Sequence, residues 1–212
     1  MIRVTEFFTS VQGESSWVGK PCTFVRLTGC PLRCRWCDTA YAFHNGEDYS
    51  IDQIVEEVRR RKVSLVEITG GEPLAQPETP SLMARLIEDK FDVMLETSGS
   101  EPLDQVPKQV KIIMDLKCPD SQMAHRNRYE NLELLKPSDE VKFVVASRDD
   151  FDWAVSTAQK WALNRRCEVL FSPAWGHVNP RDLVGWLLAA DEPGRLNLQI
   201  HKYIWGPRVK GV

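Results

Sequence analysis

Three cysteines stand within eight residues of the chain, in the stretch GCPLRCRWCDT. Cys30, Cys34 and Cys37 have the spacing C-x3-C-x2-C, which requires a loop that wraps around a metal rather than a regular helix or strand. A fourth ligand would close a structural zinc site, and His44 is the nearest candidate. Without a fourth ligand, three thiolates leave one iron of a [4Fe–4S] cluster open to a substrate or cofactor. The spacing alone leaves both kinds of site open.

Composition and charge limit the kinds of protein that could carry this motif. The chain has 212 residues, of which 42% are hydrophobic and 27% charged, and this suits one domain spanning residues 1–212. Its 27 Lys and Arg residues are outnumbered by 30 Asp and Glu, whereas nucleic-acid-binding proteins usually carry a basic excess. No apolar stretch reaches the ~18 residues of a membrane span, and no signal-peptide pattern is present. We therefore expect a cytoplasmic protein with no nucleic-acid or membrane partner.

Alternating strand and helix patterns predict an α/β fold. Short apolar runs typical of buried strands occur at 22–28, 64–69, 92–97, 110–116, 141–146, 168–172 and 196–201. Helical patterns lie between several of them. Ser50 opens one with a capping box, Thr79 and Asn179 each precede a proline at a helix start, and another helix covers roughly 150–163. Such alternation implies a parallel sheet with right-handed crossovers.

Polar and glycine-rich segments follow the predicted strands at their carboxyl ends. Gly29 and Cys30 follow the first strand and TGGEP at 69–73 follows the second, while 96–99, 115–117 and 172–173 end later strands. In α/β barrels the active site is built from many strands at this end. In an open doubly wound sheet such residues gather only near a switch point. The pattern therefore favours a barrel-like wall.

The cysteine loop and the glycine motif together resemble the radical S-adenosylmethionine superfamily. The C-x3-C-x2-C loop follows a first strand, and Gly70-Gly71-Glu72-Pro73 is similar to the second motif of that superfamily. The resemblance implies a partial (β/α) barrel with a reduced helix set. It also implies that the open iron of a [4Fe–4S] cluster binds S-adenosylmethionine, which is cleaved to a 5′-deoxyadenosyl radical.

Flanking segments narrow this resemblance to one family. VQGES at 11–15, FVRL at 24–27, WCDT at 36–39, ETSG at 96–99 and QIHKY at 199–203 resemble the 7-carboxy-7-deazaguanine synthase family. The resemblance implies a lyase of queuosine and deazapurine biosynthesis. Such an enzyme converts 6-carboxy-5,6,7,8-tetrahydropterin to 7-carboxy-7-deazaguanine by radical ring contraction, with release of ammonia and with Mg2+ present. A homodimer and a flavodoxin- or ferredoxin-type electron donor are expected as well.

The resemblance carries roles onto individual positions. Cys30, Cys34 and Cys37 would hold the cluster, and the Thr39 hydroxyl would bind Mg2+. The substrate contacts it implies are Val11, Gln12, Gly13, Glu14, Arg26, Thr69, His201 and Pro207. The S-adenosylmethionine contacts it implies are Trp36, Cys37, Asp38, Gly71, Glu72, Ser98, Asp115, Leu116, Lys117, Ser172, Pro173, Ala174 and Trp175.

Arg26 can also be interpreted from its position on a strand. It alternates with Val25 and Leu27, so it points to the opposite face, and inside a small barrel it needs an anion. A guanidinium group binds a planar carboxylate through two parallel hydrogen bonds. Arg26 is therefore the residue expected to bind the carboxylate of the substrate.

Several of these residues also have a purely structural interpretation. Glu14 would then be a solvated turn residue, Asp38 and Thr39 would cap a turn or helix, and His201 would be a core histidine on the last strand. Glu72 would serve as a hydrogen-bonding centre behind Gly71. The remaining cysteines are expected to be buried free thiols rather than ligands, and they are Cys22, Cys118 and Cys167.

Two rival functions and three departures from the family pattern stay open at this point. The rivals are a glycyl-radical-enzyme activase, which would need a groove for a protein loop, and a zinc-stabilised binding module. Family members often have Gly where Ser15 stands, and Ser-Pro-Lys where residues 115–117 read Asp-Leu-Lys. In some relatives the chain ends on a proline whose carboxylate reaches the substrate pocket. Here Pro207 is followed by the sequence RVKGV.

Overall fold

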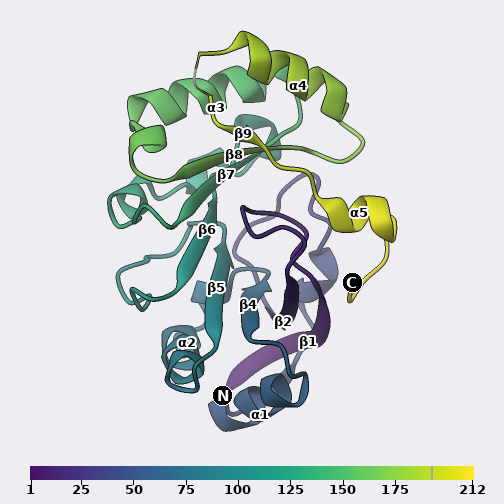
Figure 1. Cartoon of the computed structure of the whole chain (residues 1–212), viewed down its shortest axis with the longest axis vertical. Helices are drawn as coiled ribbons and strands as arrows, with labels where there is room; N and C mark the ends of the chain where they lie inside the picture. Colours follow the sequence, from purple (N-terminus) through teal and green to yellow (C-terminus); the bar gives the residue numbers. More distant parts are fainter. Residues whose placement is uncertain (192) are drawn as a thin grey trace.

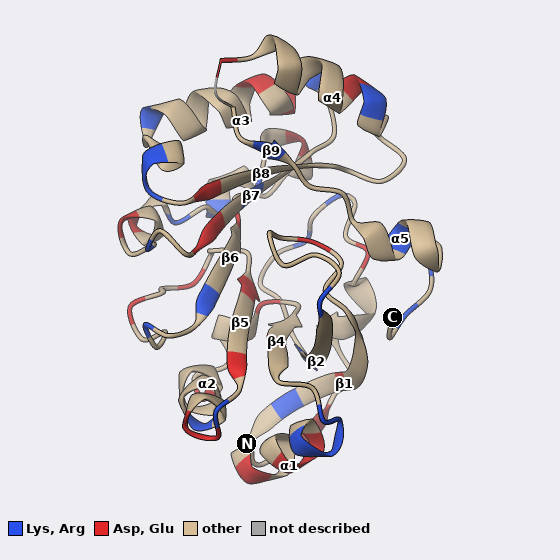
Figure 2. Ribbon diagram, viewed as in Figure 1, with Lys and Arg blue, Asp and Glu red and all other residues tan. Residues whose placement is uncertain are grey.

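In the part of the chain that the structure describes, nine strands form one continuous sheet, which is antiparallel only at the two pairings of β1. The computed structural model describes residues 1–191 and 193–212. In spatial order the strands are β3 (Glu47–Tyr49), β1 (Ile2–Val11), β2 (Pro21–Leu27), β4 (Leu65–Gly70), β5 (Asp92–Thr97), β6 (Lys111–Asp115), β7 (Glu140–Val145), β8 (Glu168–Pro173) and β9 (Arg195–Leu196). Figure 1 shows this sheet curving around a central space, and Figure 2 colours the charged residues in the same view. The two edge strands are β3 and β9.

The helices of the described residues are α1 (Ile51–Arg60), α2 (Thr79–Glu88), α3 (Arg148–Lys160), α4 (Pro180–Ala189) and α5 (Ile200–Ile204). Four of these five helices, α1 to α4, cover the outer face of the sheet, whereas the short α5 contributes to the cavity on the inner face. Short 3-10 turns η1 to η6 lie at Ala40–Phe43, Pro73–Ala75, Pro119–Ser121, Ala124–Arg126, Tyr129–Glu133 and Leu163–Arg165. The predicted helix starts are confirmed: Ser50 forms a capping box with Gln53, and Asn179 caps α4. Among the described residues, no helix has both the length and the apolar character needed to cross a membrane.

The two faces of the sheet differ sharply in polarity. Residues that point outward, such as Val25, Ile68 and Leu95, join the main hydrophobic core with the helices. Residues that point inward form a small apolar cluster at the amino ends of the strands, made of Cys22, Phe24, Leu65, Met94 and Ile113. Charged side chains follow on the same inward face, and they are Arg26, Glu67, Glu96, Asp115 and Lys142. Alternation along each strand therefore builds a dry outer layer and a polar interior.

The predicted architecture is confirmed as an α/β sheet of partial-barrel type with few helices. Over the described residues the sheet stays open, because its edge strands β3 and β9 do not pair with one another. Two strands were missing from the sequence prediction, β1 and β3. In β1 the pairing register shifts between Val4 and Glu6, and this irregularity breaks the two-residue alternation by which a strand is recognised.

The prediction of a last strand over 196–201 was wrong beyond its first residue. β9 covers only Arg195–Leu196, and the N–H of Asn197 still donates to Phe171 O at 2.8 Å. The chain then leaves the sheet, and the N–H of Ile200 donates to Gly13 O at 2.9 Å, on the loop between β1 and β2. His201 consequently lies on the short helix α5 and not on a strand.

The loop between β1 and β2, residues 12–20, reaches across the open interior to β7. Its Ser16 N–H donates to Glu140 Oε1 at 3.0 Å, and Lys142 Nζ donates to Glu14 Oε2 at 2.6 Å. In Figure 1 this hairpin tip, drawn in dark purple, lies inside the curve of the sheet, to the left of α5. The loop therefore takes over part of the closure that strand pairing would supply in a full barrel.

A close approach of two strand ends positions the cysteine loop, and it leads to a first prediction. A Cβ atom added to Gly71 would lie 2.1 Å from Gly29 O and 2.8 Å from Cys30 Cβ. We expect Gly71→Ala to displace the cysteine loop and to lower the free energy of unfolding by ~1–3 kcal/mol, as overpacking does. Denaturant titration measures this. Gly185→Ala on α4 is the control, because nothing lies within 4 Å of its added Cβ. Equal stability of the two variants would contradict the prediction.

Candidate active site

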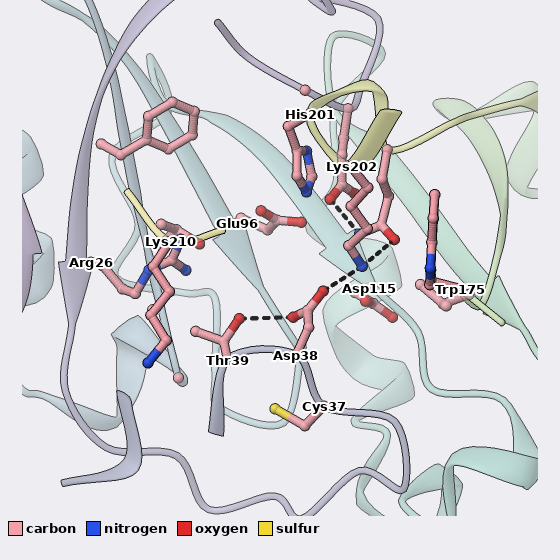
Figure 3. A pocket seen from close by; sticks show the side chains of 18 of the residues that line it. Arg26, Cys37, Asp38, Thr39, Glu96, Asp115, Trp175, His201, Lys202 and Lys210 are labelled. Carbon is pink, nitrogen blue, oxygen red and sulfur yellow. Dashed lines mark hydrogen bonds and ion pairs between the residues drawn. The ribbon is translucent and has the colours of Figure 1, made fainter. Parts of the chain in front are cut away.

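One large cavity opens on the inner face of the sheet, with a volume of about 920 Å3. Its wall combines the cysteine loop, inward-facing residues of the strands from β1 to β7, part of α5 and residues 206–212 at the end of the chain. Figure 3 looks into this cavity, where residues distant in sequence such as Asp38, Glu96 and Lys202 converge. The polar interior created by strand alternation is thus a single binding space.

The three clustered cysteines all line this cavity from one irregular loop. Backbone contacts hold the loop, because Gly29 N donates to Ala42 O at 2.8 Å and Arg35 N donates to Ser121 O at 3.2 Å. Cys30, Cys34 and Cys37 are free thiols, and burial raises the pKa of each one. A thiolate in this setting gains from binding a cation, which is what an iron–sulfur cluster provides.

The donor set fits a cluster better than a single metal ion. Within the described part of the chain, no three His, Cys, Asp or Glu side chains converge on one ion position. A cubane cluster has no such requirement, because each cysteine binds a different iron. His44, the candidate fourth zinc ligand, does not line the cavity. Its ring is packed edge-on against the Phe43 ring, with the two ring centres 6.4 Å apart.

A buried network of charges forms the floor of the cavity. Lys142 Nζ donates to Glu14 Oε2 at 2.6 Å and also contacts Glu96 Oε1. Burial alone would raise the pKa of Glu14, but Lys142 and His201 outweigh it and bring this pKa to about 2. Gln199 Nε2 adds a hydrogen bond to the other oxygen of Glu14 at 2.8 Å. Glu14 is therefore a fixed carboxylate at neutral pH and not a solvated turn residue.

Glu67 is the exception among these acids. It is 1% exposed, it accepts a hydrogen bond from Gln12 Nε2 at 3.1 Å, and it lies beside Glu96. Burial, and then the negative charge of Glu96, raise the pKa of Glu67 well above its ordinary value. Two adjacent carboxyls with little solvent favour sharing one proton. The floor thus combines Glu14, whose pKa is lowered, with Glu67, whose pKa is raised.

Asp38 and Thr39 follow directly on the last cysteine. Lys202 Nζ donates to Asp38 Oδ2 at 2.5 Å, and the Thr39 hydroxyl donates to Asp38 Oδ1 at 2.8 Å, both drawn in Figure 3. Burial opposes ionisation of Asp38, but Lys202 prevails and lowers its pKa to about 2. Thr39 precedes η1 and its side chain makes no capping hydrogen bond. The capping interpretation of the Thr39 side chain therefore fails, and Thr39 instead lines the cavity.

Arg26 already has an anionic partner within the protein. Its Nε donates to Glu6 Oε1 at 2.7 Å, and the Tyr41 hydroxyl donates to the same oxygen at 2.7 Å. Burial opposes the charge on Arg26, but Tyr41 and Glu6 more than compensate and raise its pKa. The Nε–H is used by Glu6, so the terminal nitrogens of the guanidinium are the atoms left for a ligand.

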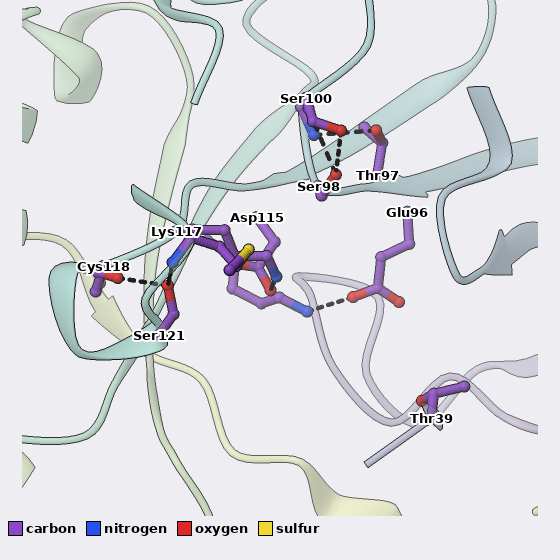
Figure 4. Close-up of polar contacts among 12 residues, drawn as sticks. Thr39, Glu96, Thr97, Ser98, Ser100, Asp115, Lys117, Cys118 and Ser121 are labelled. Carbon is purple, nitrogen blue, oxygen red and sulfur yellow. Dashed lines mark hydrogen bonds and ion pairs between the residues drawn. The ribbon is translucent and has the colours of Figure 1, made fainter. Parts of the chain in front are cut away.

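Behind the wall, Glu72 anchors the glycine motif. Its carboxylate is fully buried and accepts hydrogen bonds from Thr97 Oγ1 at 2.8 Å, Ser98 N at 2.7 Å and Leu74 N at 3.0 Å. Gly71 and Ser98 line the cavity, whereas Glu72 does not. Figure 4 shows Ser98 and Ser100 on one side and the Asp115–Lys117 pair, at 2.9 Å, on the other. Glu72 is thus a hydrogen-bonding centre behind Gly71, as its structural interpretation predicted.

Most of the predicted site residues meet in this one cavity. Those that line it are Val11, Gln12, Gly13, Glu14, Arg26, Cys30, Cys34, Trp36, Cys37, Asp38, Thr39, Thr69, Gly71, Ser98, Asp115, Lys117, Ala174, Trp175, His201 and Pro207. Four predicted cofactor contacts lie outside the lining: Glu72, Leu116, Ser172 and Pro173. Leu116 is buried in the outer core, and the Ser172 hydroxyl accepts a hydrogen bond from Asn197 Nδ2 at 2.8 Å. For these four, a contact with the cofactor stays a prediction.

The sequence prediction missed the charged residues of the floor, Glu67, Glu96 and Lys142. Each is a charged residue on a strand whose neighbours are mostly apolar, as in VEI at 66–68 and VKF at 141–143. A charge buried on a strand needs a partner, so this pattern would have been the signal. Which charges pair with which depended on the order of the strands.

Comparison with known proteins identifies the family. The family model of the radical SAM superfamily matches residues 24–162. The chain is 45% identical to the 7-carboxy-7-deazaguanine synthase of Koribacter versatilis over the whole of both chains. The chain belongs to the 7-carboxy-7-deazaguanine synthase family. The enzyme of the same name from Chlorobaculum tepidum is 42% identical, over all of this chain and 97% of that one.

Solved structures agree with this assignment at the level of the fold. The crystal structure of QueE from Escherichia coli matches with a TM-score of 0.77 and 22% identity, over 93% of each chain. The structure of SuiB from Streptococcus suis, bound to its precursor peptide SuiA, matches with a TM-score of 0.59 and 14% identity, over 81% of this chain and 46% of that one. The partial barrel is thus a fold that this chain shares with both proteins.

Membership of the 7-carboxy-7-deazaguanine synthase family decides between the functions left open by the sequence. A zinc-stabilised binding module is wrong, because members of the radical SAM superfamily use a [4Fe–4S] cluster and S-adenosylmethionine. The glycyl-radical-enzyme activase also loses its support, because the full-length relatives are deazaguanine synthases. The family therefore implies a [4Fe–4S] cluster, and the cavity wall offers three clustered thiols that could hold it, those of Cys30, Cys34 and Cys37.

The cysteine loop leads to a prediction about iron content. After anaerobic reconstitution the wild type should be brown, with about four irons per chain. Replacing Cys30, Cys34 or Cys37 by Ala should remove the cluster absorbance and most of the iron. Cys118→Ala is the matched control, because this thiol is 1% exposed and belongs to the outer core. Loss of the cluster from Cys118→Ala would contradict the three-ligand site.

The raised pKa of Glu67 leads to a prediction about stability and pH. An acid whose pKa is raised by folding stabilises the protein below its unfolded pKa, about 4.3, and loses that contribution as pH rises through the folded pKa. Gln mimics the neutral acid, so Glu67→Gln should gain thermal stability relative to wild type as pH rises from 5 to 9. Thermal unfolding of the cluster-free proteins measures this. The exposed Glu88→Gln should show no such trend, and a pH-independent difference for Glu67→Gln would contradict the protonated state.

Proposed function

We propose that this chain converts 6-carboxy-5,6,7,8-tetrahydropterin to 7-carboxy-7-deazaguanine, with release of ammonia. The names of the full-length relatives support the reaction. The observation that carries the proposal further is the single cavity that joins the cluster cysteines to Arg26 and to the floor of carboxylates. A carboxylated, nitrogen-rich heterocycle needs a cation at one end and hydrogen-bond acceptors at the other. Residues 1–212 act as one radical SAM domain in this proposal.

The protein's own residues bind and orient the pterin. When bound, S-adenosylmethionine and the cluster supply the radical that abstracts a hydrogen atom from the substrate. Glu14 and Glu96 are acceptors for the N–H groups of the pterin ring, and Lys142 keeps both carboxylates in place. Arg26 and Thr69 are paired neighbours on β2 and β4, and Arg26 faces the carboxylate of the substrate. The remaining substrate contacts in the proposal are Val11, Gln12, Gly13, His201 and Pro207.

Mg2+ binds at Thr39 in this proposal. The support is the Thr39 hydroxyl, which makes no capping hydrogen bond to η1 and lies beside the Asp38 carboxylate in the same cavity as the cysteines. Mg2+ prefers oxygen ligands and retains several waters, so one threonine oxygen plus substrate oxygens form a suitable set. The role of the ion is to orient the substrate and to stabilise charge that develops during ring contraction.

Contacts with S-adenosylmethionine are proposed for the residues nearest the cysteine loop. Those on the cavity wall are Trp36, Cys37, Asp38, Gly71, Ser98, Asp115, Lys117, Ala174 and Trp175. A flavodoxin- or ferredoxin-type protein supplies the electron, and the enzyme works as a homodimer in the cytoplasm. The six cysteines, all in the described part of the chain, are free thiols, and this suits a reducing compartment.

Anaerobic turnover tests the function. The reconstituted protein, given a reductant, S-adenosylmethionine and 6-carboxytetrahydropterin, should form 7-carboxy-7-deazaguanine, detected by mass spectrometry. Cleavage of S-adenosylmethionine without any change of the pterin would show a radical SAM enzyme with a different substrate, and the proposal would then fail.

The magnesium site leads to a prediction about Thr39. Thr39→Val removes the hydroxyl and nearly keeps the shape, so it should lower turnover several-fold and weaken its dependence on Mg2+, while the iron content stays at the wild-type level. Titration of Mg2+ under anaerobic turnover measures both effects. Thr9→Val is a matched control, because Thr9 is exposed on β1 and does not line the cavity. A wild-type magnesium response in Thr39→Val would rule out this metal ligand.

A further inference from the structure

The last residues of the chain fold back along the cavity wall. Residues 206–212 all line the cavity that also holds the cluster cysteines. Gly211 packs against β1, where a Cβ atom added to it would lie 3.8 Å from Glu6 Oε2 and 3.9 Å from Phe8 Cβ. Figure 1 shows the chain leaving α5 and ending close to β1. The five residues after Pro207 are therefore part of the site and do not extend away from it.

Lys210 differs from the other lysines of this cavity in its partner. Lys117, Lys142 and Lys202 are each paired with a carboxylate of the protein. Among the described residues Lys210 has no such carboxylate, and its Nζ lies 4.1 Å from the centre of the Tyr41 ring. An exposed cation–π contact of this kind contributes only ~0.5–1 kcal/mol. An anion that enters the cavity can therefore bind the Lys210 ammonium without first breaking an ion pair, unlike the ammonium groups of the other three lysines.

The position of Lys210 points to one part of the substrate. The Arg26 guanidinium lies 6.0 Å from the centre of the same Tyr41 ring, and Figure 3 shows Lys210 and Arg26 next to one another in the cavity. Arg26 gives its Nε–H to Glu6, and this bond neutralises part of its charge. A carboxylate that binds the free nitrogens of Arg26 would therefore face a nearly neutral pair, unless a second cation stands beside it.

From this arrangement we infer that Lys210 is the second cation for the substrate carboxylate, acting together with Arg26. The inference rests on the proposed function, because it takes the carboxylated pterin as the ligand. Lys210 turns toward the carboxylate from its place over Tyr41 and makes a charge-assisted hydrogen bond. Tail residues after Pro207 thereby determine specificity for a carboxylated over an uncarboxylated pterin.

Equilibrium binding to the reconstituted holoenzyme, without reductant, tests this role. The probes are 6-carboxytetrahydropterin and tetrahydropterin, which lacks the carboxylate. Lys210→Gln should raise the Kd of the carboxylated pterin roughly fivefold to tenfold and leave that of tetrahydropterin unchanged. Lys210→Arg should restore most of the affinity because it keeps the charge. Lys108→Gln, a remote exposed lysine, is the matched control and should bind both pterins as wild type does.

The outcomes separate this role from the proposed function. Unchanged binding by Lys210→Gln, in an enzyme that turns over the carboxylated pterin, would overturn the role of Lys210 alone. An equal loss for both pterins would also overturn it, because the tail would then only pack against the ligand. If Arg208→Gln weakened binding of the carboxylated pterin more than Lys210→Gln does, the contact would belong to Arg208 and the inference would be refuted. Wild-type protein that binds neither pterin would refute the inference and the proposed function together.

Discussion

The buried ammonium group of Lys142 holds the binding space together. It lies on β7 and is 3% exposed, and it joins Glu14 of the β1–β2 loop to Glu96 of β5. The sheet of the described residues is open, so these contacts replace part of the strand pairing that closes a full barrel. Removing one partner from a buried ion pair typically costs ~3–5 kcal/mol. The position of the loop, and with it Gln12 and Gly13, therefore depends on this one charge.

Two further pairs of opposite charges lie on the inner face of the sheet. Lys111 and Glu140 pair at 2.8 Å near the amino ends of the strands, and Lys117 and Asp115 pair at 2.9 Å at the carboxyl ends. Each pair removes the penalty of an isolated buried charge and fixes the direction of its donors and acceptors. The inner face of the sheet is consequently polar and preorganised, while the outer face supplies the hydrophobic core. Such a division suits a rigid heterocycle with many hydrogen-bonding atoms.

The parts of the fold that follow from short-range patterns were predictable from the sequence. The strand at Asp92–Thr97 and the capped starts of α1 and α4 depend on local alternation and on local hydrogen bonds. The bulged strand β1 was missed because its alternation is interrupted. The run at 196–201 was misassigned because its backbone pairs with a distant loop, a contact that no local pattern encodes.

The candidate site was predictable where a motif fixes it and not where pairing across strands does. The cysteine loop, Gly71 and Asp38 came from motifs and line the cavity. The partners of Lys142 could not be predicted, because Glu14, Glu96 and Lys142 become neighbours only through the order of the strands. The hydrogen bond of Arg26 to Glu6 was hidden for a similar reason, since Glu6 follows the irregularity in β1.

The contacts of the C-terminal segment set an order in which the site is completed during synthesis. Lys202 pairs with Asp38, Gln199 with Glu14, and Ile200 with Gly13. In each pair the first-named residue is synthesised long after its partner, so the contact can form only late in synthesis. Until then the cavity beside the cysteine loop lacks the side chains of His201 and Lys202, and the Asp38 carboxylate lacks its partner Lys202. Before these contacts form, the cavity is open on the side where His201 and Lys202 of α5 later complete its wall.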